Sequence, residues 1–494
     1  MDIFGLVHSI ASHLPEIKAP VAPPSAKERL IWTGVALVLF FMMYNTTCFG
    51  VVHSQGTFDF LQTITASKIG SLLTAGIGPI VFASIFLQLF NGAGLLSLNM
   101  KDKEDKKKFL ETQKVLAIVL ALVEGIIFVV TLKVGITPIF TNLGEGMVAT
   151  VAGGQAVNAP YTMVLVILQI AFGSIIILYL DEIVTKYGIG SGISLFIAAG
   201  VSFSIVTGVT ALIFGSGGIV SVMSEGGAEA LPNALLAIAP FIFTIIVFFV
   251  VVYAEGIKVE IPIAFERVRG LVPKLPLKYF YVSNIPVIFA SALILNIQLF
   301  GTALQGNYFT IPLTDIDITG IVHAIGYVDS QGQLRDGLLY LMTPIYAGSG
   351  TLAHWEFLIN AQTPIYHIPE WVHAIMYVLT LSVLSLLFGL FWVETANMDA
   401  KSVANQLMGS GLQIPGFRRD PRMLETILNK HILPLTVLGS ISVGLLAGIA
   451  DLTGALGTGT GILLSVGILY KMYEQMEQQQ MFELYPALKG LTGG

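Results

Sequence analysis

A serine in a glycine-rich turn is the residue whose type and setting most suggest catalysis in this sequence. Ser191 stands in GIGSGIS, a turn that could hold a serine nucleophile. Such a nucleophile needs a base within reach, and the only histidine inside an expected membrane span is His373, at the end of one. The sequence has no HExxH motif of a zinc protease, and its eight histidines do not cluster at metal-ligand spacing. We therefore expect no enzyme, no cofactor and no bound metal.

Ionisable side chains inside apolar segments are the second kind of residue that could do chemistry, because they often mark an ion or proton path. Only the apolar segment 115–134 carries one away from its ends: it has Glu124 near its middle, together with Lys133 near one end. A proton-coupled transporter is expected to place several carboxylates near the membrane midplane. A solute transporter built from inverted repeats therefore stays as the alternative function.

The composition identifies the elements that must position these residues as membrane spans. Of the 494 residues, 54% are hydrophobic and only 11% are charged, whereas a soluble domain carries roughly 25% charged residues. A single cysteine, Cys48, excludes an internal disulfide. A bilayer crossing needs about 20 apolar residues, and ten segments meet that need: 30–49, 72–90, 115–134, 161–180, 191–213, 234–254, 283–301, 371–393, 432–450 and 455–473.

The distribution of positive charge predicts the orientation of these spans. If the N-terminus lies in the cytosol, all but three of the 25 Lys and Arg residues fall on the cytosolic side, the exceptions being Lys68, Lys133 and Arg335. The positive-inside rule then places both termini in the cytosol. Residues 1–29 have no basic n-region of a cleavable signal, and their apolar spacing predicts a cytosolic amphipathic segment on the membrane surface.

Equal sets of five spans predict two halves that enter the membrane from opposite sides, an arrangement compatible with an inverted repeat. The N-terminal half is residues 30–214 and the C-terminal half is residues 234–477. A glycine-rich external link, 215–233, is expected to act as a hinge between them, and residues 478–494 form a cytosolic tail.

Two long cytosolic loops of the C-terminal half, 255–284 and 393–430, carry clusters of Arg and Lys. Basic loops often do no more than orient neighbouring spans. These loops are longer than a connection needs, and Arg418 and Arg419 follow Pro415 and Gly416 at an apparent tip, which suits a phosphate-rich partner.

The stretch TFDFLQTITASKIG, residues 57–70, has a helix-like apolar pattern but is too short and too polar to cross the bilayer. It follows the first span and must leave again on the outer side. A non-spanning helix at membrane depth needs protein or a water-filled cavity around it. The stretch therefore either caps the outer surface or folds back into a cavity.

Several separate motifs resemble the SecY family, in its archaeal branch close to the eukaryotic Sec61 α subunit. The resemblance runs from about residue 25 to 480 and rests on QTITASKIG, GIGPIV, LDEIVTKYGIGSGISLFIAAGVS, VYAEGIKVEIPIA, YVSNIPVI, FWVET and GALGTGTGILL. It implies an all-α polytopic membrane protein with ten transmembrane helices in two inverted five-helix halves, a clamshell, with a re-entrant plug helix. The implied function is the central pore of a protein-conducting channel, which translocates unfolded secretory polypeptides and releases transmembrane segments laterally into lipid.

The resemblance also implies roles for individual residues. The plug would include Asp59, Phe60, Leu61, Thr63, Ile64, Ser67 and Ile69. The narrow pore ring would be Ile77, Val81, Ile193, Ile197, Ile288 and Leu464. The lateral gate would include Phe82, Glu124 and Asn296. The docking surface for the ribosome would include Arg267, Arg269, Lys274, Arg418, Arg419 and Arg422. Relatives can carry a small hydroxyl residue where this chain has Phe82, so the polar set at the gate is incomplete here.

The partners that the resemblance implies are a single-span SecE/γ subunit, a small β subunit, the ribosome, signal sequences and nascent chains, and the lipid bilayer. The implied location is the plasma membrane, crossed several times. No GxxxxGK[ST] motor motif occurs in the chain, so the energy for translocation must come from the ribosome or from pulling on the far side.

Overall fold

The computed structural model describes most of the chain. The described residues are 9, 11, 13–20, 22, 24–51, 65–92, 95–96, 98, 102–130, 148–150, 156–158, 160–215, 218–225, 234, 237–262, 264–265, 274–302, 319–328, 334–345, 351–409, 412–413 and 421–484. Of the predicted amphipathic segment 1–29, residues 1–8, 10, 12, 21 and 23 lie outside them, as does the predicted cytosolic tail beyond residue 484.

Each of the ten predicted apolar segments coincides with a helix. These helices are α2 (Ala26–Asn45), α4 (Gly78–Gly92), α5 (Lys103–Val130), α6 (Pro160–Tyr187), α7 (Gly192–Phe214), α10 (Ala239–Gly256), α11 (Ile285–Thr302), α15 (Glu370–Thr395), α17 (Pro421–Leu452) and α18 (Gly459–Leu484). Within the described residues, α5, α6, α7, α10, α15 and α17 are long and apolar enough to cross a membrane, and α4 and α11 are shorter apolar helices. The chain is therefore a multi-pass membrane protein.

The outer faces of these helices carry large apolar side chains that no other described part of the chain covers. Met42 on α2, Phe172 on α6 and Phe249 on α10 are each at least 60% exposed. A water-soluble protein rarely exposes apolar patches on this scale. The exposed faces therefore meet lipid.

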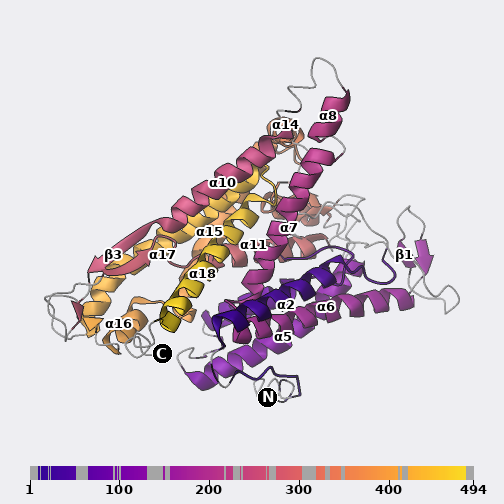
Figure 1. Ribbon diagram of the computed structural model, residues 1–494. Helices are drawn as coiled ribbons and strands as arrows, with labels where there is room; N and C mark the ends of the chain where they lie inside the picture. The colour runs from indigo at the N-terminus through magenta and orange to yellow at the C-terminus, as the bar shows by residue number, and fades with distance from the viewer. Residues whose placement is uncertain are drawn as a thin grey trace.

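The helices form two groups that correspond to the two halves of the sequence (Figure 1). In the first group, α5 packs against α4 and α6, and α2 packs against α6. In the second, α15 packs against α11 and α17, and α18 packs against α10 and α17. The groups meet along two seams, one between α7 and α18 and the other where α4 meets α11 and α15.

Glycine and serine allow the tightest helix pair in the second group. A methyl group added at Gly389 of α15 would lie 2.0 Å from Ser440 Oγ of α17, and one added at Gly444 would lie 2.7 Å from the Cα atom of Ser382. In a membrane the lipid tails are as apolar as the side chains, so the hydrophobic effect does not drive helices together and close packing must do so. Small residues allow this packing, because they let the helix backbones approach each other. The α15–α17 contact is thus fixed by residues that leave no room for larger side chains.

Short helices and two-stranded ladders connect the long helices. The short helices are α8 (Ile219–Glu225), which lies within the predicted hinge, α12 (Thr319–Ile325), α13 (Leu338–Leu341), α14 (Thr351–Asn360) and α16 (Ala400–Gly409). The antiparallel ladders are β1 (Val148–Thr150) with β2 (Ala156–Asn158), β3 (Lys258–Pro262) with β5 (Lys274–Lys278), β4 (Ala264–Phe265) with β8 (Leu412–Gln413), and β6 (Tyr327–Val328) with β7 (Leu334–Asp336). These ladders are an addition to the all-helical architecture that the sequence predicts.

Candidate functional site

The six predicted ring residues come together from four helices. They are Ile77 and Val81 at the start of α4, Ile193 and Ile197 on α7, Ile288 on α11 and Leu464 on α18. Five of them are less than 9% exposed and belong to one continuous buried cluster, and Ile193 packs against that cluster while only partly buried. In each of the first two pairs the residues are four apart, so they lie on one face of the helix. The cluster spans both seams between the halves.

A cavity of about 480 Å³ opens on one side of this cluster. The lining includes Ile288 of the ring, the start of α7 with Ser191 and Ser194, and the cationic side chains of Arg29 and Lys471. Ser191, which the sequence suggested as a possible nucleophile, is the N-cap of α7. The walls of the cavity are mixed, with hydroxyl and cationic groups beside apolar side chains such as Ile285, Ile468 and Met472.

Another side of the cluster is covered by a turn-rich segment, residues 65–76, which we call the turn segment. Ala66 and Leu73 are fully buried in the same cluster as the ring. Thr65 Oγ1 donates to Ser67 Oγ at 2.6 Å, and the Ile77 amide donates to the Thr65 carbonyl at 2.9 Å. These bonds satisfy polar groups that would otherwise be costly to bury.

The turn segment differs from the helix that the sequence predicts for the plug. Ser67 and Ile69 lie outside any helix, and positive φ angles occur at Ala66, Gly70 and Gly76, which a helix does not allow. A methyl group at Gly76 would lie 2.1 Å from the Thr65 carbonyl oxygen. The other predicted plug residues, Asp59, Phe60, Leu61, Thr63 and Ile64, lie outside the described residues.

Hydrogen bonds fasten the turn segment to the loop that follows α2. The Cys48 amide donates to the Gly70 carbonyl at 2.8 Å, and the Leu72 amide donates to the Thr46 carbonyl at 2.9 Å. The Cys48 thiol donates to the Ser71 carbonyl at 3.2 Å. The segment is therefore held by backbone contacts as well as by burial against the ring.

The three predicted gate residues are all buried, on three helices of the α4 seam. Glu124 on α5 lies against the start of α4, because a methyl group at Gly78 would come within 2.9 Å of its Oε2 atom. Glu124 Oε1 has no hydrogen-bond partner among the described residues. Asn296 on α11 donates to the Ala292 carbonyl at 2.9 Å. Phe82 packs on Phe86, with 4.4 Å between the ring centroids.

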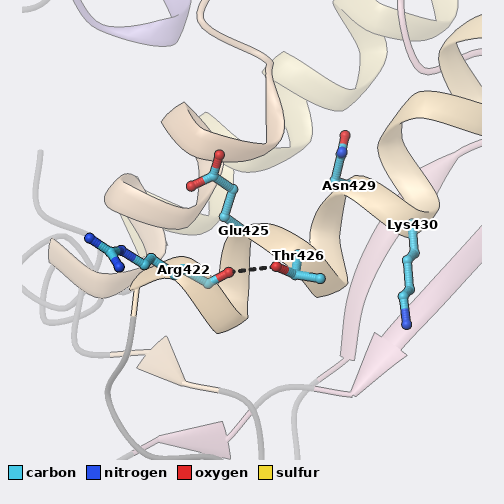
Figure 2. Close-up of a pocket in the computed structure, with 5 residues that line it drawn as sticks. All are labelled: Arg422, Glu425, Thr426, Asn429 and Lys430. Atoms are coloured by element: carbon cyan, nitrogen blue, oxygen red, sulfur yellow. Dashed lines mark hydrogen bonds between the residues drawn. The ribbon is translucent and has the colours of Figure 1, made fainter.

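Most predicted docking residues lie outside the described residues: Arg267, Arg269, Arg418 and Arg419. Lys274 begins β5. Arg422, near the start of α17, is exposed and lines a cavity of about 430 Å³ together with Glu425, Thr426, Asn429 and Lys430. Figure 2 shows these five side chains along one stretch of α17, where Thr426 Oγ1 donates to the Arg422 carbonyl at 2.8 Å.

The two basic loops are joined to each other. Strand β4 comes from the first loop and β8 from the second, with Ala264 opposite Gln413 and Phe265 opposite Leu412. The β3–β5 hairpin of the first loop is tied in turn to α18, because Glu474 lies 3.8 Å from Lys258 and forms an ion pair with Lys278. Sequence reasoning missed both connections, since the paired residues are far apart in the chain.

A cluster at the ends of α5 and α6 was also missed from the sequence. Glu182 lies 3.2 Å from Lys114 and 2.9 Å from Lys186. The same two lysines donate to backbone carbonyls of residues 13–20, which we call the N-terminal strap: Lys114 donates to Pro15 at 2.9 Å and Lys186 donates to Ile17. In the sequence these lysines carry information only about orientation.

In the described part of the chain, no three His, Cys, Asp or Glu side chains gather in a way that could hold a metal ion. The features of the site are instead a buried aliphatic cluster, a cavity of mixed lining on one side of it and a buried turn segment against it. This arrangement suits passage and closure rather than bond-making chemistry.

Comparison with known proteins agrees with this geometry. A family model described as SecY matches residues 71–473. The protein translocase subunit SecY of Methanocaldococcus jannaschii is 41% identical over 486 residues, which cover 98% of this chain and 98% of the relative. A solved structure described as "The structure of a protein conducting channel" is similar with a TM-score of 0.75 and 40% identity, covering 97% of this chain and 98% of that chain.

A second solved structure, described as "Sec61 in the Canine ribosome-channel complex from the endoplasmic reticulum", is similar with a TM-score of 0.72 and 40% identity, covering 97% of this chain and 98% of that chain. The family model covers far more than half of the chain, and the similarity to the relative extends over almost its whole length. The chain belongs to the SecY family.

Proposed function

We propose that this chain is the central pore-forming subunit of a protein-conducting channel, which translocates unfolded polypeptides and releases transmembrane segments sideways into lipid. One observation carries the proposal: a single aliphatic cluster, to which four helices contribute, borders both a cavity lined in part by hydroxyl and cationic groups and a buried turn segment. The full architecture is a clamshell of ten spans in two inverted halves; among the described residues, six helices are both long and apolar enough to cross a membrane.

The chemistry of the ring suits a pore that must hold back ions and still pass any sequence. A narrow apolar constriction disfavours water and so hinders ions. Aliphatic side chains make no fixed hydrogen bonds, so they can change rotamer around a passing chain without leaving a polar group unpaired. The turn segment, together with the plug residues before it, would close the resting pore and move aside when a chain enters.

Sideways release requires one seam to open while the other stays closed. The predicted hinge, 215–233, joins α7 to the second half, and α7 packs against α18. The seam between α7 and α18 therefore lies near the hinge, and the seam between α4 and α11 is the one free to open. Glu124 and Asn296 would favour the closed state by polar contact, with Phe82 replacing a polar member of the gate by an aromatic contact.

The joined basic loops would dock the ribosome, with Arg267, Arg269, Lys274, Arg418, Arg419 and Arg422 facing phosphate groups of its RNA. The similar Sec61 structure is of a ribosome–channel complex, which supports this partner. Single-span SecE/γ and small β subunits, signal sequences and nascent chains complete the proposed partners. Both termini lie in the cytosol, and the membrane is the plasma membrane.

The solute-transporter alternative is not favoured. Transporters with inverted repeats bind their substrate and ions near the midplane, at broken helices with polar or charged groups. Here the same region is filled by the aliphatic cluster.

Crosslinking to a stalled client chain tests the proposal. In a Cys48→Ser background, one variant carries Ile193→Cys in the ring and a matched control carries Phe172→Cys on the lipid-facing side of α6, where Phe172 is 60% exposed. A stalled secretory chain with a thiol-reactive probe at its middle is engaged in membranes that contain the channel. We expect crosslinks at residue 193 and none at residue 172.

Silence at residue 193, with the chain shown to be engaged by protection from protease, would refute the assignment of the ring. Equal crosslinking at both positions would mean that the chain passes along the lipid-facing surface rather than through the pore.

A further inference from the structure

The start of α7 is fixed by an aspartate from the helix before it. Asp181, near the end of α6, accepts a hydrogen bond from the Ile193 amide at 2.8 Å through its Oδ1 atom. The approach is so close that a methyl group at Gly192 would lie 2.5 Å from the Cα atom of Asp181. Ser191, the residue at the N-cap, makes no side-chain capping bond. Asp181 therefore takes the role of the cap from another helix.

The start of α18 is also capped by an aspartate from the preceding helix, although Thr458 of its own turn adds a side-chain cap by accepting from the Gly461 amide at 3.0 Å. Asp451, near the end of α17, accepts from the Thr460 amide at 2.8 Å through Oδ1, and the Thr460 hydroxyl donates to its Oδ2 atom. The Tyr377 hydroxyl donates to the same Oδ2 atom at 2.6 Å. A methyl group at Gly459 would lie 2.1 Å from the Ala450 carbonyl carbon. Again the capping carboxylate comes from the preceding helix, across a turn that only glycine fits.

The two turns align in sequence and share the conformation of their first glycine, but they differ at the second residue, where φ is −98° at Ser191 and +60° at Thr458. Gly190-Ser191-Gly192-Ile193 corresponds to Gly457-Thr458-Gly459-Thr460, and the first glycine has φ +74° in one turn and +73° in the other. Seven residues after that glycine stand Ile197 and Leu464, both fully buried ring residues. The capped amide is in each case four residues, about one helical turn or 6 Å, before the ring residue.

The two caps lie at opposite ends of an antiparallel pair. A methyl group at Gly190 would lie 3.3 Å from Gln475 Oε1, in the second half of α18, and one at Gly457 would lie 2.8 Å from Ile205 Cγ1, in the second half of α7. The same device therefore anchors α7 from one side of the ring and α18 from the other.

We propose that Asp181 and Asp451 are positioning residues that set the height of Ile197 and Leu464 in the pore ring. The inference rests on the proposed ring. An α-helix is axially stiff, and its first amides have no partners within the helix. A carboxylate held by the preceding helix thus fixes where the helix begins and, one turn later, where its ring side chain lies. Each half of the channel carries its own anchor, so each side of the ring is set independently.

Thiol accessibility tests this positioning in the full channel in its native membrane, in a Cys48→Ser background. Reporter variants carry Ile197→Cys or Leu464→Cys, and each is combined with Asp181→Ala or Asp451→Ala. The matched control is Asp399→Ala, which removes a carboxylate that accepts from the Ser402 amide at 3.2 Å at the start of α16, away from the ring. The readout is the rate of modification by a polar methanethiosulfonate reagent.

We expect a crossed pattern. Asp181→Ala raises the modification rate at residue 197 by roughly five- to thirty-fold, the range that corresponds to loss of one helix cap, and leaves residue 464 unchanged. Asp451→Ala raises the modification rate at residue 464 by the same factor and leaves residue 197 unchanged. Asp399→Ala changes the rate at neither residue. Asp181→Asn and Asp451→Asn, which keep an acceptor oxygen for the capped amide, restore protection at the corresponding reporter.

If either alanine variant raises the modification rate at residues 197 and 464 together, the fold has loosened generally and the positioning role is refuted. An unchanged modification rate at both residues would also refute it. If an alanine variant does not accumulate in the membrane, Asp181→Glu and Asp451→Glu replace it; they move the acceptor by one methylene and must give the same crossed pattern. Crosslinking of residues 197 and 464 to a stalled client is scored separately. Its absence would refute the ring, whereas its presence without the crossed pattern would refute only the anchors.

Discussion

The N-terminal half, from α2 to α7, and the C-terminal half, from α10 to α18, carry the same capped turn but surround it with different additions. The first half adds the turn segment, which is buried against the ring. The second half adds the paired basic loops, held together by the β4–β8 ladder and tied to α18 through Glu474. The proposed ring draws on both halves, and what differs between the halves is the segment buried against it in the first and the paired basic loops in the second.

This difference teaches that the ring and its cover are separable. The ring residues are held by helix starts and helix packing, which involve both halves. The turn segment is held by bonds to the loop after α2 and by glycines with positive φ, all within the first half. A change in the cover should therefore leave the ring and the docking loops in place.

The largest expected effect comes from Gly76→Ala, which changes the cover directly beside the ring residue Ile77. The added methyl group would lie 2.1 Å from the Thr65 carbonyl oxygen at a φ of +54°, and strain and overpacking together cost roughly 2–4 kcal/mol. We expect the turn segment to leave its site and the resting channel to leak ions, measured as conductance in planar bilayers. Gly34→Ala is the control, because nothing lies within 4 Å of that position.

A channel that stays tight in the Gly76→Ala variant would break the comparison, since the ring alone would then be the seal.

A smaller effect is expected from charge reversal on the docking side, with Arg422→Glu and Lys430→Glu together. Both side chains line the exposed cavity on α17. Removing one cation that binds a phosphate should lower the slope of log affinity against log salt concentration by about one. Ribosome binding to channel-containing membranes should weaken, while resting conductance stays unchanged. Lys107→Glu, on the exposed face of α5 in the other half, is the matched control.

If Lys107→Glu weakens ribosome binding as much as the α17 pair does, docking is not confined to the second half.

The smallest effect is expected from Glu182→Gln, which tests how the N-terminal strap is held to the first half. It removes the carboxylate between Lys114 and Lys186, two partly buried ion pairs that together contribute on the order of 1 kcal/mol. The N-terminal strap should release more readily, seen as faster protease cleavage within residues 13–20. Glu111→Gln, whose partner Lys107 is 70% exposed, should leave the cleavage rate unchanged.

Cleavage at the parental rate in Glu182→Gln would mean that the lysines hold the N-terminal strap without help from the acid.

The sequence predicts the long helices well because a run of about 20 apolar residues matches the thickness of a bilayer and is typical of a membrane-spanning helix. It places the second span at residue 72, whereas α4 begins at Gly78. The reason is the turn segment, whose apolar residues resemble a helix start although Gly70 and Gly76 hold positive φ angles. The ring and gate positions could be assigned only by resemblance, because burial and partner helices are invisible in a single sequence.

Contacts between distant parts of the chain could not be predicted at all. The β4–β8 ladder joins residues from two loops, and such short pairing leaves no periodic pattern in the sequence. The two capped turns are an intermediate case. GSGI and GTGT are legible as similar glycine-rich turns, but the carboxylates that cap them, Asp181 and Asp451, are recognisable as a pair only from the hydrogen bonds.

The N-terminal strap has a consequence for the order in which the molecule is assembled during its own synthesis. Its bond partners lie 99 residues later, at Lys114, and 169 residues later, at Lys186 and Tyr187. The strap therefore leaves the ribosome long before its partners and is among the last parts of the first half to dock. It can reach Lys114 once α5 has been made, but the full set of bonds requires the end of α6, which carries Lys186 and Tyr187.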